Sequence, residues 1–544
     1  MYKAIRGFDK GEPVYEPITD FVIRIKSLLL TAEGYERDVV FIKGGHESPR
    51  IVMTSRSMAS RVAFMTFCNN AGYFNYTGSD ADLAHLWADI QSETPEKVIA
   101  QPDHVGFIAV EDAWLFRNAL IKNGQVHQPD GEGVFWIAPG RGLRPAALSG
   151  NIDKGKKAMS SGSEIPYMII NPDQAEMENL AADLLDAMRE NLGGYKAYLA
   201  VGWTLALVFQ RELVARYDSF PILYLYGKRG CGKNTLANWL TQFWGLYDVG
   251  KNIAESTPTG ISRRLSYFSA LPVWFDEYRN EKRVAIKDGV LRDAYNFVGA
   301  TKGIAANFGT RDVAVRGSLI LTGEHMPEDN GLFSRCLVIQ LSTLERRDSL
   351  YQRVNELIQG ASAIVTDLLL RKNHETAAAF IDNVETVRRK LKDDGLTDRD
   401  AYGYAVAAAG LFLLREDVDF LHWIRKDGDR VQEIKESETI VSGFLEDMCV
   451  MKAMGQLPQD FYDRHWVDGH LYLYFSGIYS IWAKEHRQRT GDKAWGRNTI
   501  LDQFKEEAFF VACNFPHRFN GAVRKSLKLD MAKLPDSVRE AFEQ

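Results

Sequence analysis

Hydrophobic and polar residues alternate in short runs through the first part of the chain. Runs such as DVVFIKGG at 38–45, KVIAQ at 97–101 and VGFIAV at 105–110 have the length and β-branched content of strands, and Gly or Pro residues separate them. One stretch, SMASRVAFMTFCNNAG at 57–72, has apolar residues at helical spacing. The pattern predicts an α+β domain over residues 1–152.

The apolar spacing becomes helical after a polar interruption. NIDKGKKAMSSGSEIP at 151–166 is rich in Gly, Ser and Lys and has no hydrophobic period, which predicts a linker over 153–172. Apolar residues at helical spacing predict packed helices, a helical collar, over 173–219. Further amphipathic stretches and the apolar stretch AYGYAVAAAGLFLL at 401–414 predict an α-helical region over 346–470.

Short apolar runs of strand length lie between the two helical regions. They are PILYLYG at 221–227, LPVWFDEY at 271–278, GSLILTG at 317–323 and CLVIQL at 336–341. The first run is followed by TLANWLTQFWG at 235–245, where Leu, Trp, Leu and Phe recur at helical spacing. The order of strand, loop and helix predicts an α/β domain over 220–345.

The loop after the first of these strands has the pattern G-x-x-x-x-G-K. Glycines let backbone N–H groups turn toward an anion, the helix N-terminus adds a favourable dipole, and the lysine reaches the β- and γ-phosphates. A plain structural turn is the alternative, but the position between a strand and a helix favours ATP binding. The predicted ATP-binding residues are Gly227, Lys228, Arg229, Gly230, Cys231, Gly232, Lys233, Asn234 and Thr235.

Asn234 departs from this pattern, because a Ser or Thr hydroxyl normally joins the Mg²⁺ shell at that place. An amide oxygen is a possible neutral ligand, and Thr235 supplies a hydroxyl one residue later. With Asp276, these two residues are the expected Mg²⁺ ligands. Weaker metal binding is one expected consequence, but loss of activity does not follow from the sequence.

Polar residues at the ends of the later strands complete a predicted catalytic set with Lys233. Asp276 is expected to coordinate Mg²⁺ and Glu277 to polarise the attacking water; a solvated strand end is the alternative. Thr322 ends the next strand, together with Glu324, where a sensor of the γ-phosphate is expected. Arg335 precedes the following strand and is expected to act in the ATP site of a neighbouring subunit; a surface arginine is the alternative.

This order of motifs, preceded by Phe220 and Pro221, resembles the AAA+ superfamily 3 and MCM-like replicative helicases of phages, plasmids and other mobile elements. The resemblance covers residues 220–342. It implies an AAA+ ATPase core, ATP and Mg²⁺ as cofactors, a homo-oligomeric ring that is expected to be a hexamer, and a β-hairpin that grips single-stranded DNA in the pore. Asn234 and the TGE sequence at 322–324, in place of the usual sensor asparagine, depart from the family pattern.

The segment TKGIAANFGTRDVAVRG at 301–317 fits the expected hairpin. Lys302 and Arg311 suit phosphate contacts near its tip, and Phe308 suits stacking on a base. An ordinary solvated hairpin is the alternative.

A second candidate for DNA binding lies near the end of the sequence. Between Ser480 and Lys528, ten Lys and Arg residues stand against five Asp and Glu residues, in a chain whose net charge is −6. Helix, turn, helix, strand, an Asn-Gly turn and strand follow in order, which predicts a winged helix over 471–544. The expected contacts to duplex DNA are Arg497, Arg518, Arg524 and Lys525. Docking of another protein is the alternative use.

Composition narrows the setting. Hydrophobic residues make up 45% and charged residues 25% of the 544 residues, as in ordinary globular proteins. The five cysteines are scattered without a CxxC pair, so a reducing cytoplasm is expected. The longest apolar run, at 197–209, is shorter than the roughly 20 residues of a membrane span, so no membrane association is expected.

These features together predict a multidomain α/β ATP-dependent DNA helicase or translocase that acts as a ring in replication of a mobile element or phage. An ATP-dependent DNA-binding initiator or loader that unwinds little or no DNA is the alternative, and Asn234 is its best support. A primase-helicase is a third possibility, but residues 1–152 offer no acidic triad or zinc ligands for priming chemistry.

Overall fold

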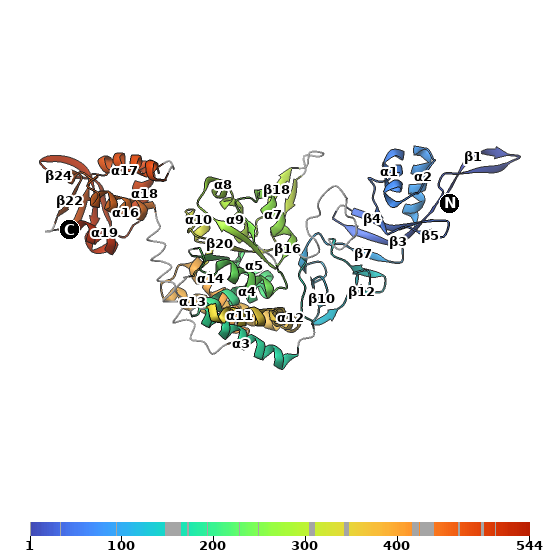
Figure 1. Ribbon diagram of the computed structural model, residues 1–544, viewed down its shortest axis with the longest axis horizontal. Helices are drawn as coiled ribbons and strands as arrows, with labels where there is room; N and C mark the ends of the chain where they lie inside the picture. Colours follow the sequence, from blue (N-terminus) through green and yellow to red (C-terminus); the bar gives the residue numbers. More distant parts are fainter. Residues whose placement is uncertain are drawn as a thin grey trace. The chain divides into compact units, whose positions relative to one another are not determined.

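The computed structural model describes residues 2–32, 34–93, 95–146, 165–170, 173–192, 194–227, 229–247, 250–303, 310–341, 348–415, 424, 440–465, 468–490, 494–505 and 507–543. The chain divides into two compact units, Met1–Leu421 and His422–Gln544 (Figure 1). Within the described residues, no helix combines the length and apolar character needed to cross a membrane.

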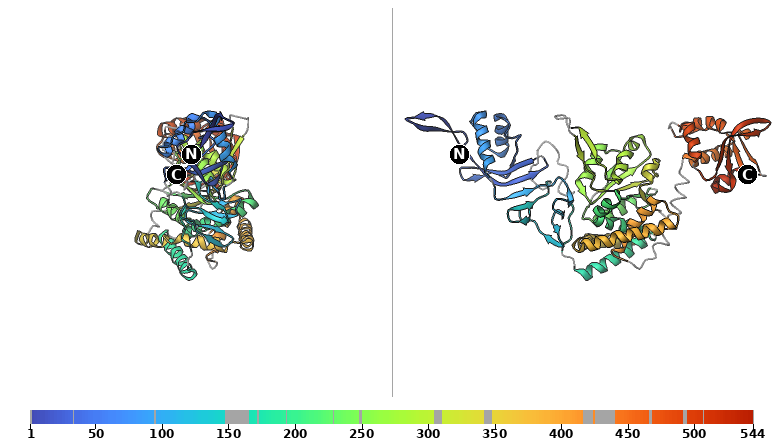
Figure 2. Two further views of the ribbon diagram at one scale, coloured as in Figure 1. Left: turned by 90° about the vertical axis from the view of Figure 1, so that its right-hand side faces the viewer. Right: turned by 180° about the vertical axis from the view of Figure 1, so that it is seen from behind.

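The first unit begins with the predicted α+β domain. Its seven-stranded sheet contains β3 (Val22–Thr31), β4 (Gly34–Lys43), β5 (His46–Glu47), β6 (Ile51–Met53), β7 (Val98–Ala100), β12 (Phe135–Ala138) and β13 (Arg141–Leu143). Helices α1 (Arg61–Ala71) and α2 (Asp80–Ser92) cover one face of this sheet (Figure 1), and their apolar side chains share a core with Val39 and Phe41 of β4. A hairpin of β1 (Lys3–Asp9) and β2 (Glu12–Pro17) extends from the domain (Figure 2).

A second sheet connects this domain to the central part of the unit. Its strands are β8 (Val105–Ile108), β9 (Ala113–Leu115), β10 (Leu120–Lys122), β11 (Gln125–His127) and β16 (Phe268–Ser269). Strand β16 comes from the predicted α/β domain and pairs in parallel with β8. Trp114 also stacks on Trp244, with ring centroids 5.3 Å apart. Segments on either side of the predicted linker therefore share one sheet.

A five-stranded parallel sheet forms the centre of the first unit. The strands lie in the order β15 (Lys251–Asn252), β17 (Pro272–Tyr278), β20 (Ser318–Gly323), β14 (Ile222–Tyr226) and β21 (Cys336–Gln340). The strands are mostly buried, as expected for a parallel sheet with both faces covered. The helices associated with it are α6 (Lys233–Gln242), α7 (Pro258–Tyr267), α8 (Lys282–Ala285), α9 (Asp288–Tyr295) and α10 (Asn330–Phe333). Because all the carboxyl ends lie at one edge, polar residues that follow different strands meet there.

The helices before and after this sheet form one layer. They are α3 (Gln174–Leu192), α4 (Lys196–Ala206), η3 (Leu207–Phe209), α5 (Gln210–Tyr217), α11 (Asp348–Ile358), α12 (Ala361–Arg371), α13 (His374–Asp393) and α14 (Asp398–Phe412). Helix α3 packs against α11 and α12, and α4 packs against α14. A Cβ at Gly202 would lie 2.0 Å from the Ala407 carbonyl oxygen, so only glycine permits this approach. The predicted collar therefore packs on helices of the later helical region.

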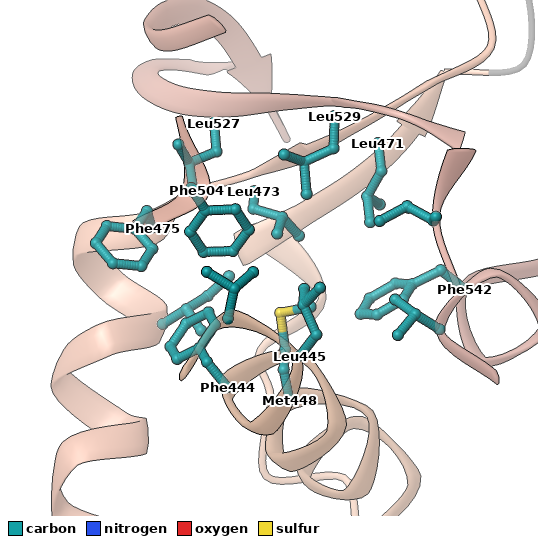
Figure 3. Packing of buried hydrophobic residues seen from close by; sticks show 14 of the residues in the cluster. Phe444, Leu445, Met448, Leu471, Leu473, Phe475, Phe504, Leu527, Leu529 and Phe542 are labelled. Atoms are coloured by element: carbon teal, nitrogen blue, oxygen red, sulfur yellow. The ribbon is translucent and has the colours of Figure 1, made fainter. Parts of the chain in front are cut away.

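The second unit combines helices with an antiparallel sheet. Its elements are α16 (Ile440–Ala453), η4 (Gln459–Phe461), β22 (Tyr462–His465), β23 (His470–Leu473), α17 (Phe475–Thr490), α18 (Arg497–Phe504), β24 (Phe510–Phe519), β25 (Ala522–Asp530), η5 (Met531–Lys533) and α19 (Asp536–Glu543). Phe444 of α16, Phe504 of α18 and Leu527 of β25 share its hydrophobic core (Figure 3). The predicted boundary at residue 471 falls inside this unit, because α16 contributes to the same core.

The end of the second unit has the order of elements expected from the sequence. Helices α17 and α18 are followed by the antiparallel strands β24 and β25. The turn between the strands contains Asn520 with φ 45° and Gly521 with φ 92°, the left-handed conformation that an Asn-Gly turn provides. The hairpin that the sequence predicts is therefore present.

Candidate active site

A cleft of about 530 Å³ opens at the carboxyl ends of β14, β17 and β20. This size is within the range of small-molecule sites. Residues from three separate strand ends line it: Arg229, Gly230, Gly232, Lys233, Asn234 and Thr235 from the phosphate-loop segment, Asp276, Glu277, Tyr278 and Arg279 after β17, and Gly323 and Glu324 after β20. The structure thus brings most of the predicted ATP-site residues together. Lys228 lies outside the described residues.

The phosphate loop has a backbone that depends on glycine. Gly230 and Gly232 have φ of 84° and 95°, and a Cβ at Gly227 would lie 2.4 Å from the Leu341 carbonyl oxygen. Helix α6 begins at Lys233, so its first backbone N–H groups lie at the loop. The Lys233 side chain is buried and its Nζ donates to the Gly227 carbonyl oxygen at 2.6 Å. The ammonium group is therefore held over the loop, where it suits an anion.

Asp276 accepts hydrogen bonds on both carboxylate oxygens. Asn234 Nδ2 donates to Oδ2 at 2.5 Å, while the Glu277 N–H, at 2.7 Å, and the Thr322 hydroxyl donate to Oδ1. Trp274 Nε1 in turn donates to the Thr322 hydroxyl at 3.1 Å. These donors fix the orientation of the carboxylate at the edge of the cleft.

Thr322 has a different position from the one expected of a phosphate sensor. Its side chain is fully buried between Trp274 and Asp276 and does not line the cleft. The physical reason is that its hydroxyl is used by Asp276. Gly323 and Glu324, the next residues along, line the cleft instead.

Asn234 presents a donor rather than a metal ligand to Asp276. The sequence suggested that its amide oxygen replaces the usual hydroxyl, but here the amide nitrogen faces the carboxylate. The amide has to turn, or release Asp276, before its oxygen is able to join a metal shell. Thr235 is half-buried and lines the cleft.

Glu277 is held by a residue that the sequence did not reveal. Asn252 Nδ2 donates to Glu277 Oε2 at 2.7 Å, and Asn252 Oδ1 accepts from the Ala254 N–H at 2.8 Å. Glu277 has φ 60°, a strained conformation for a residue other than glycine and one that is common at functional sites. Strand β15, which carries Asn252, lies on the far side of β17 from β14. Asn252 therefore holds the carboxylate toward the sheet edge and away from the phosphate loop.

The donor set is compatible with Mg²⁺ bound together with a polyphosphate. Among the described residues, no group of three or more His, Cys, Asp and Glu side chains is arranged to hold a metal ion by itself. Mg²⁺ in phosphate sites usually takes one or two protein ligands and completes its shell with phosphate oxygens and water. Asp276 with Thr235 meets that requirement.

Arg335 lies at the amino ends of the strands of the central sheet, whereas the cleft lies at their carboxyl ends. Its neighbour Cys336 pairs with Ile222 at the amino end of β14, so the length of β14 separates it from the phosphate loop, about 15 Å at roughly 3.3 Å per residue. Its Nη1 donates to the Gly331 carbonyl oxygen, and its guanidinium lies 5.6 Å from the Tyr295 ring centroid. Burial, followed by the charge of Arg399, lowers the pKa of Arg335. This position excludes a contact between Arg335 and the cleft of the same chain.

The segment predicted to form the pore hairpin contains two antiparallel strands, β18 (Ala300–Gly303) and β19 (Thr310–Val313). Lys302 stands opposite Arg311 in the register. Phe308 lies outside the described residues.

The predicted DNA-binding residues of the second unit divide into two kinds. Arg518 and Lys525 are exposed on the β24–β25 hairpin, and Arg497 is exposed at the start of α18, where its Nη2 donates to Ser476 Oγ at 2.7 Å. Arg524 instead pairs with Asp460 at 2.9 Å and lies over the Tyr474 ring. Its guanidinium therefore has partners within the unit.

Comparison with solved structures gives this fold a precedent. The structural match to the SCCmec type IV Cch active helicase covers 95% of this chain and 95% of the helicase chain, at 14% sequence identity and a TM-score of 0.53. The match to the C-terminal region of NrS-1, in its A-form apo structure, covers 92% of this chain and 96% of that chain, at 12% sequence identity and a TM-score of 0.28. The match to the inhibitor-bound JCV helicase covers 41% of this chain and 70% of that chain, at 16% sequence identity and a TM-score of 0.21.

No protein-family model matches the sequence, and no curated protein is significantly similar to it. The first of the structural matches shows a shared multidomain α/β fold.

Proposed function

We propose that the protein is an AAA+ ATPase that hydrolyses ATP in the cleft and uses the energy to move along and unwind DNA as a ring. The observation that carries this proposal is the meeting of Lys233, Asp276 and Glu277 in one cleft from separate strand ends. A plain structural turn would not require a buried lysine ammonium over the loop and two carboxylates that line the same cleft. The fold shared with the SCCmec type IV Cch active helicase supports the proposal at the level of architecture.

The roles of the residues follow from their positions. The phosphate loop and the Lys233 ammonium bind the polyphosphate of ATP through backbone N–H groups and positive charge. Asp276 and Thr235 are the proposed protein ligands of the Mg²⁺ that binds together with ATP, and the Thr322 hydroxyl keeps the Asp276 carboxylate oriented. Mg²⁺, when bound, neutralises charge that develops on the phosphate oxygens. Glu277 orients the attacking water once Asn252 releases its carboxylate.

A ring follows from the position of Arg335 if this residue takes part in hydrolysis. Because Arg335 lies at the amino ends of the strands and the cleft of the same chain lies at their carboxyl ends, Arg335 stabilises transition-state charge only in the site of a neighbouring copy. We assign it this role, in a ring expected to be a hexamer. The β18–β19 hairpin then contacts single-stranded DNA, and the winged helix of the second unit contacts duplex DNA through Arg497, Arg518 and Lys525.

An assembly factor that binds ATP without unwinding DNA is the second candidate. The observation that favours it is the bond from Asn234 to Asp276, which occupies a carboxylate oxygen that the metal needs. ATP hydrolysis with and without single-stranded DNA, together with unwinding of a forked duplex, separates the two candidates. DNA-stimulated hydrolysis with unwinding supports the helicase, and ATP binding without turnover supports the assembly factor.

A further inference from the structure

The β1–β2 hairpin, which we call the arm, extends from the N-terminal domain, and no role proposed above uses it (Figure 1). Its two strands form a sheet of their own, and a two-stranded hairpin is only marginally stable in water by itself. Ile5, Phe8 and Tyr15 on this arm are all exposed to solvent. Apolar side chains that gather on an exposed element mark an interaction surface.

A bulge in β1 places these side chains on one face of the arm. The register shifts after Ile5, which lies opposite Tyr15. Phe8 lies opposite Pro13, two positions from Tyr15 on β2. Residues directly opposite each other in an antiparallel pair share a face, as do residues two positions apart on one strand, so these four residues form one apolar face. Ala4 belongs to the other face and packs against the core of the domain.

Arg6 fixes the arm to its own domain. Its guanidinium donates to both carboxylate oxygens of Asp82, at 3.1 Å to Oδ1 and 2.8 Å to Oδ2, and its Nε donates to Glu16 at 3.1 Å. Asp82 belongs to the capping box of α2, where it also accepts from the Ser79 N–H at 2.8 Å. A bidentate pair has a fixed geometry, so the arm is held in a defined direction.

The tip of the arm carries two carboxylates side by side. Asp9 lies directly opposite Glu12, and both are exposed. Like charges at opposite positions of a strand pair repel each other, and Lys10 in the turn offsets only one of the two charges. A cation supplied by a partner relieves this repulsion. The arm therefore presents an apolar face next to negative charge.

A groove on the same chain has the complementary properties. Its volume is about 370 Å³, and it is lined by Lys97, Trp136, Ile137, Ala138, Pro139 and Gly140. The groove lies at the end of β12, which is an edge strand of the seven-stranded sheet in the part of the chain that the structure describes. Lys97 is its single charged residue, and the ammonium group lies 5.5 Å from the Trp136 ring centroid. This groove suits an aromatic side chain that has a carboxylate beside it.

We propose that the apolar face of the arm docks in the Trp136 groove of a second copy of this chain. Phe8 then packs against Trp136, while the carboxylates of Asp9 and Glu12 face Lys97. The two surfaces differ from each other, so the contact is head-to-tail, and such contacts close into a ring when the rotation between copies permits. The inference goes beyond the proposed ATPase function, because the contact does not need ATP hydrolysis.

The test measures self-association of the full chain by sedimentation velocity over a range of protein concentrations. Phe8→Ser should weaken the association of the wild type by about 30-fold or more, the effect of truncating an aromatic residue at the centre of an interface. The variant should fold normally, because Phe8 is 71% exposed. Tyr35→Ser is the matched control: Tyr35 is 70% exposed on β4 of the same domain, and its loss should leave the association unchanged.

An exchange of charges tests whether the arm and the groove meet each other. Lys97→Glu places a third carboxylate beside Asp9 and Glu12 and should weaken association about tenfold. Adding Glu12→Lys to Lys97→Glu should restore association to within about threefold of the wild type, because the exchanged charges attract again. The docking is overturned if Phe8→Ser associates as tightly as Tyr35→Ser, or if the double variant associates no more tightly than Lys97→Glu alone.

ATP hydrolysis by the same samples separates this inference from the proposed function. A wild type that associates through the arm but does not hydrolyse ATP supports the docking and contradicts the proposed function alone. A wild type that hydrolyses ATP, but whose Phe8→Ser variant associates like the control, contradicts the docking alone. A wild type that stays monomeric at every concentration, with and without a non-hydrolysable ATP analogue, contradicts the docking and the proposed ring together.

Discussion

Asn234 offers the most direct test of how the site handles metal. Its amide nitrogen donates to Asp276 Oδ2 at 2.5 Å, on a carboxylate oxygen that a metal ion needs. Asn234→Ala removes this competitor, and Asn234→Thr removes it and adds a hydroxyl that can join the shell. We expect both variants to bind Mg²⁺ with ATP more tightly than the wild type.

The magnitude follows from the strength of the bond that the metal has to replace. A hydrogen bond to a charged group contributes about 1.5–3 kcal/mol, and the exposed position of Asn234 favours the lower end. About 1.4 kcal/mol corresponds to a factor of ten in affinity. The half-saturating Mg²⁺ concentration should therefore fall about tenfold in Asn234→Ala, and at least as far in Asn234→Thr.

The assay is binding of a non-hydrolysable ATP analogue as Mg²⁺ is titrated. Asn238→Ala is the matched control, because Asn238 lies one turn further along α6 and does not line the cleft. If Asn234→Ala needs more Mg²⁺ than the wild type, the amide oxygen of Asn234 is itself a ligand, and the competition argument is wrong.

Three further predictions follow. Thr322→Val leaves the buried Trp274 indole N–H without its acceptor and should lower the free energy of unfolding by about 1–3 kcal/mol. Thermal denaturation measures this change, and an unchanged melting midpoint would contradict the prediction. Arg335→Ala should abolish hydrolysis but regain part of it when mixed with inactive Lys233→Ala subunits, and absence of recovery would contradict action in trans. Burial raises the pKa of Asp288 to about 6, so the ionised carboxylate lowers the stability of the folded protein more strongly as pH rises from about 4 through 6. The melting midpoint of Asp288→Asn should therefore increase relative to that of the wild type across this range. A difference between the two midpoints that does not change with pH would refute the assignment.

The local parts of the site could be predicted because their chemistry is contiguous in the sequence. The glycines and Lys233 follow a strand and begin a helix, and Asp276 and Glu277 end an apolar run, so the order of residues alone indicates their meeting. The hairpin arms around Lys302 and Arg311 were recognisable for the same reason.

The contacts made across the sheet could not be predicted. Asn252 stands in a two-residue strand with no hydrophobic pattern, and only the strand order brings it to Glu277. Lys287 reads as one more charge between two short helices until the fold buries it. Thr322 ends a strand that is buried throughout, so no alternation of polar and apolar residues shows that its side chain faces the interior.

Domain boundaries were the other difficulty, because they depend on packing between distant segments. Residues 105–127 form a sheet with β16 although the predicted linker separates the two in sequence. Helix α16 belongs with the second unit because Phe444 contributes to its core, a contact that helical periodicity does not reveal.

The most direct test of the central claim is ATP hydrolysis by the full chain with and without single-stranded DNA, compared with Glu277→Gln. The proposed mechanism predicts that the wild type hydrolyses ATP, that DNA accelerates it, and that Glu277→Gln still binds ATP but does not turn it over. A wild type that binds ATP yet is as inactive as Glu277→Gln, with and without DNA, would contradict the helicase function and favour the assembly factor.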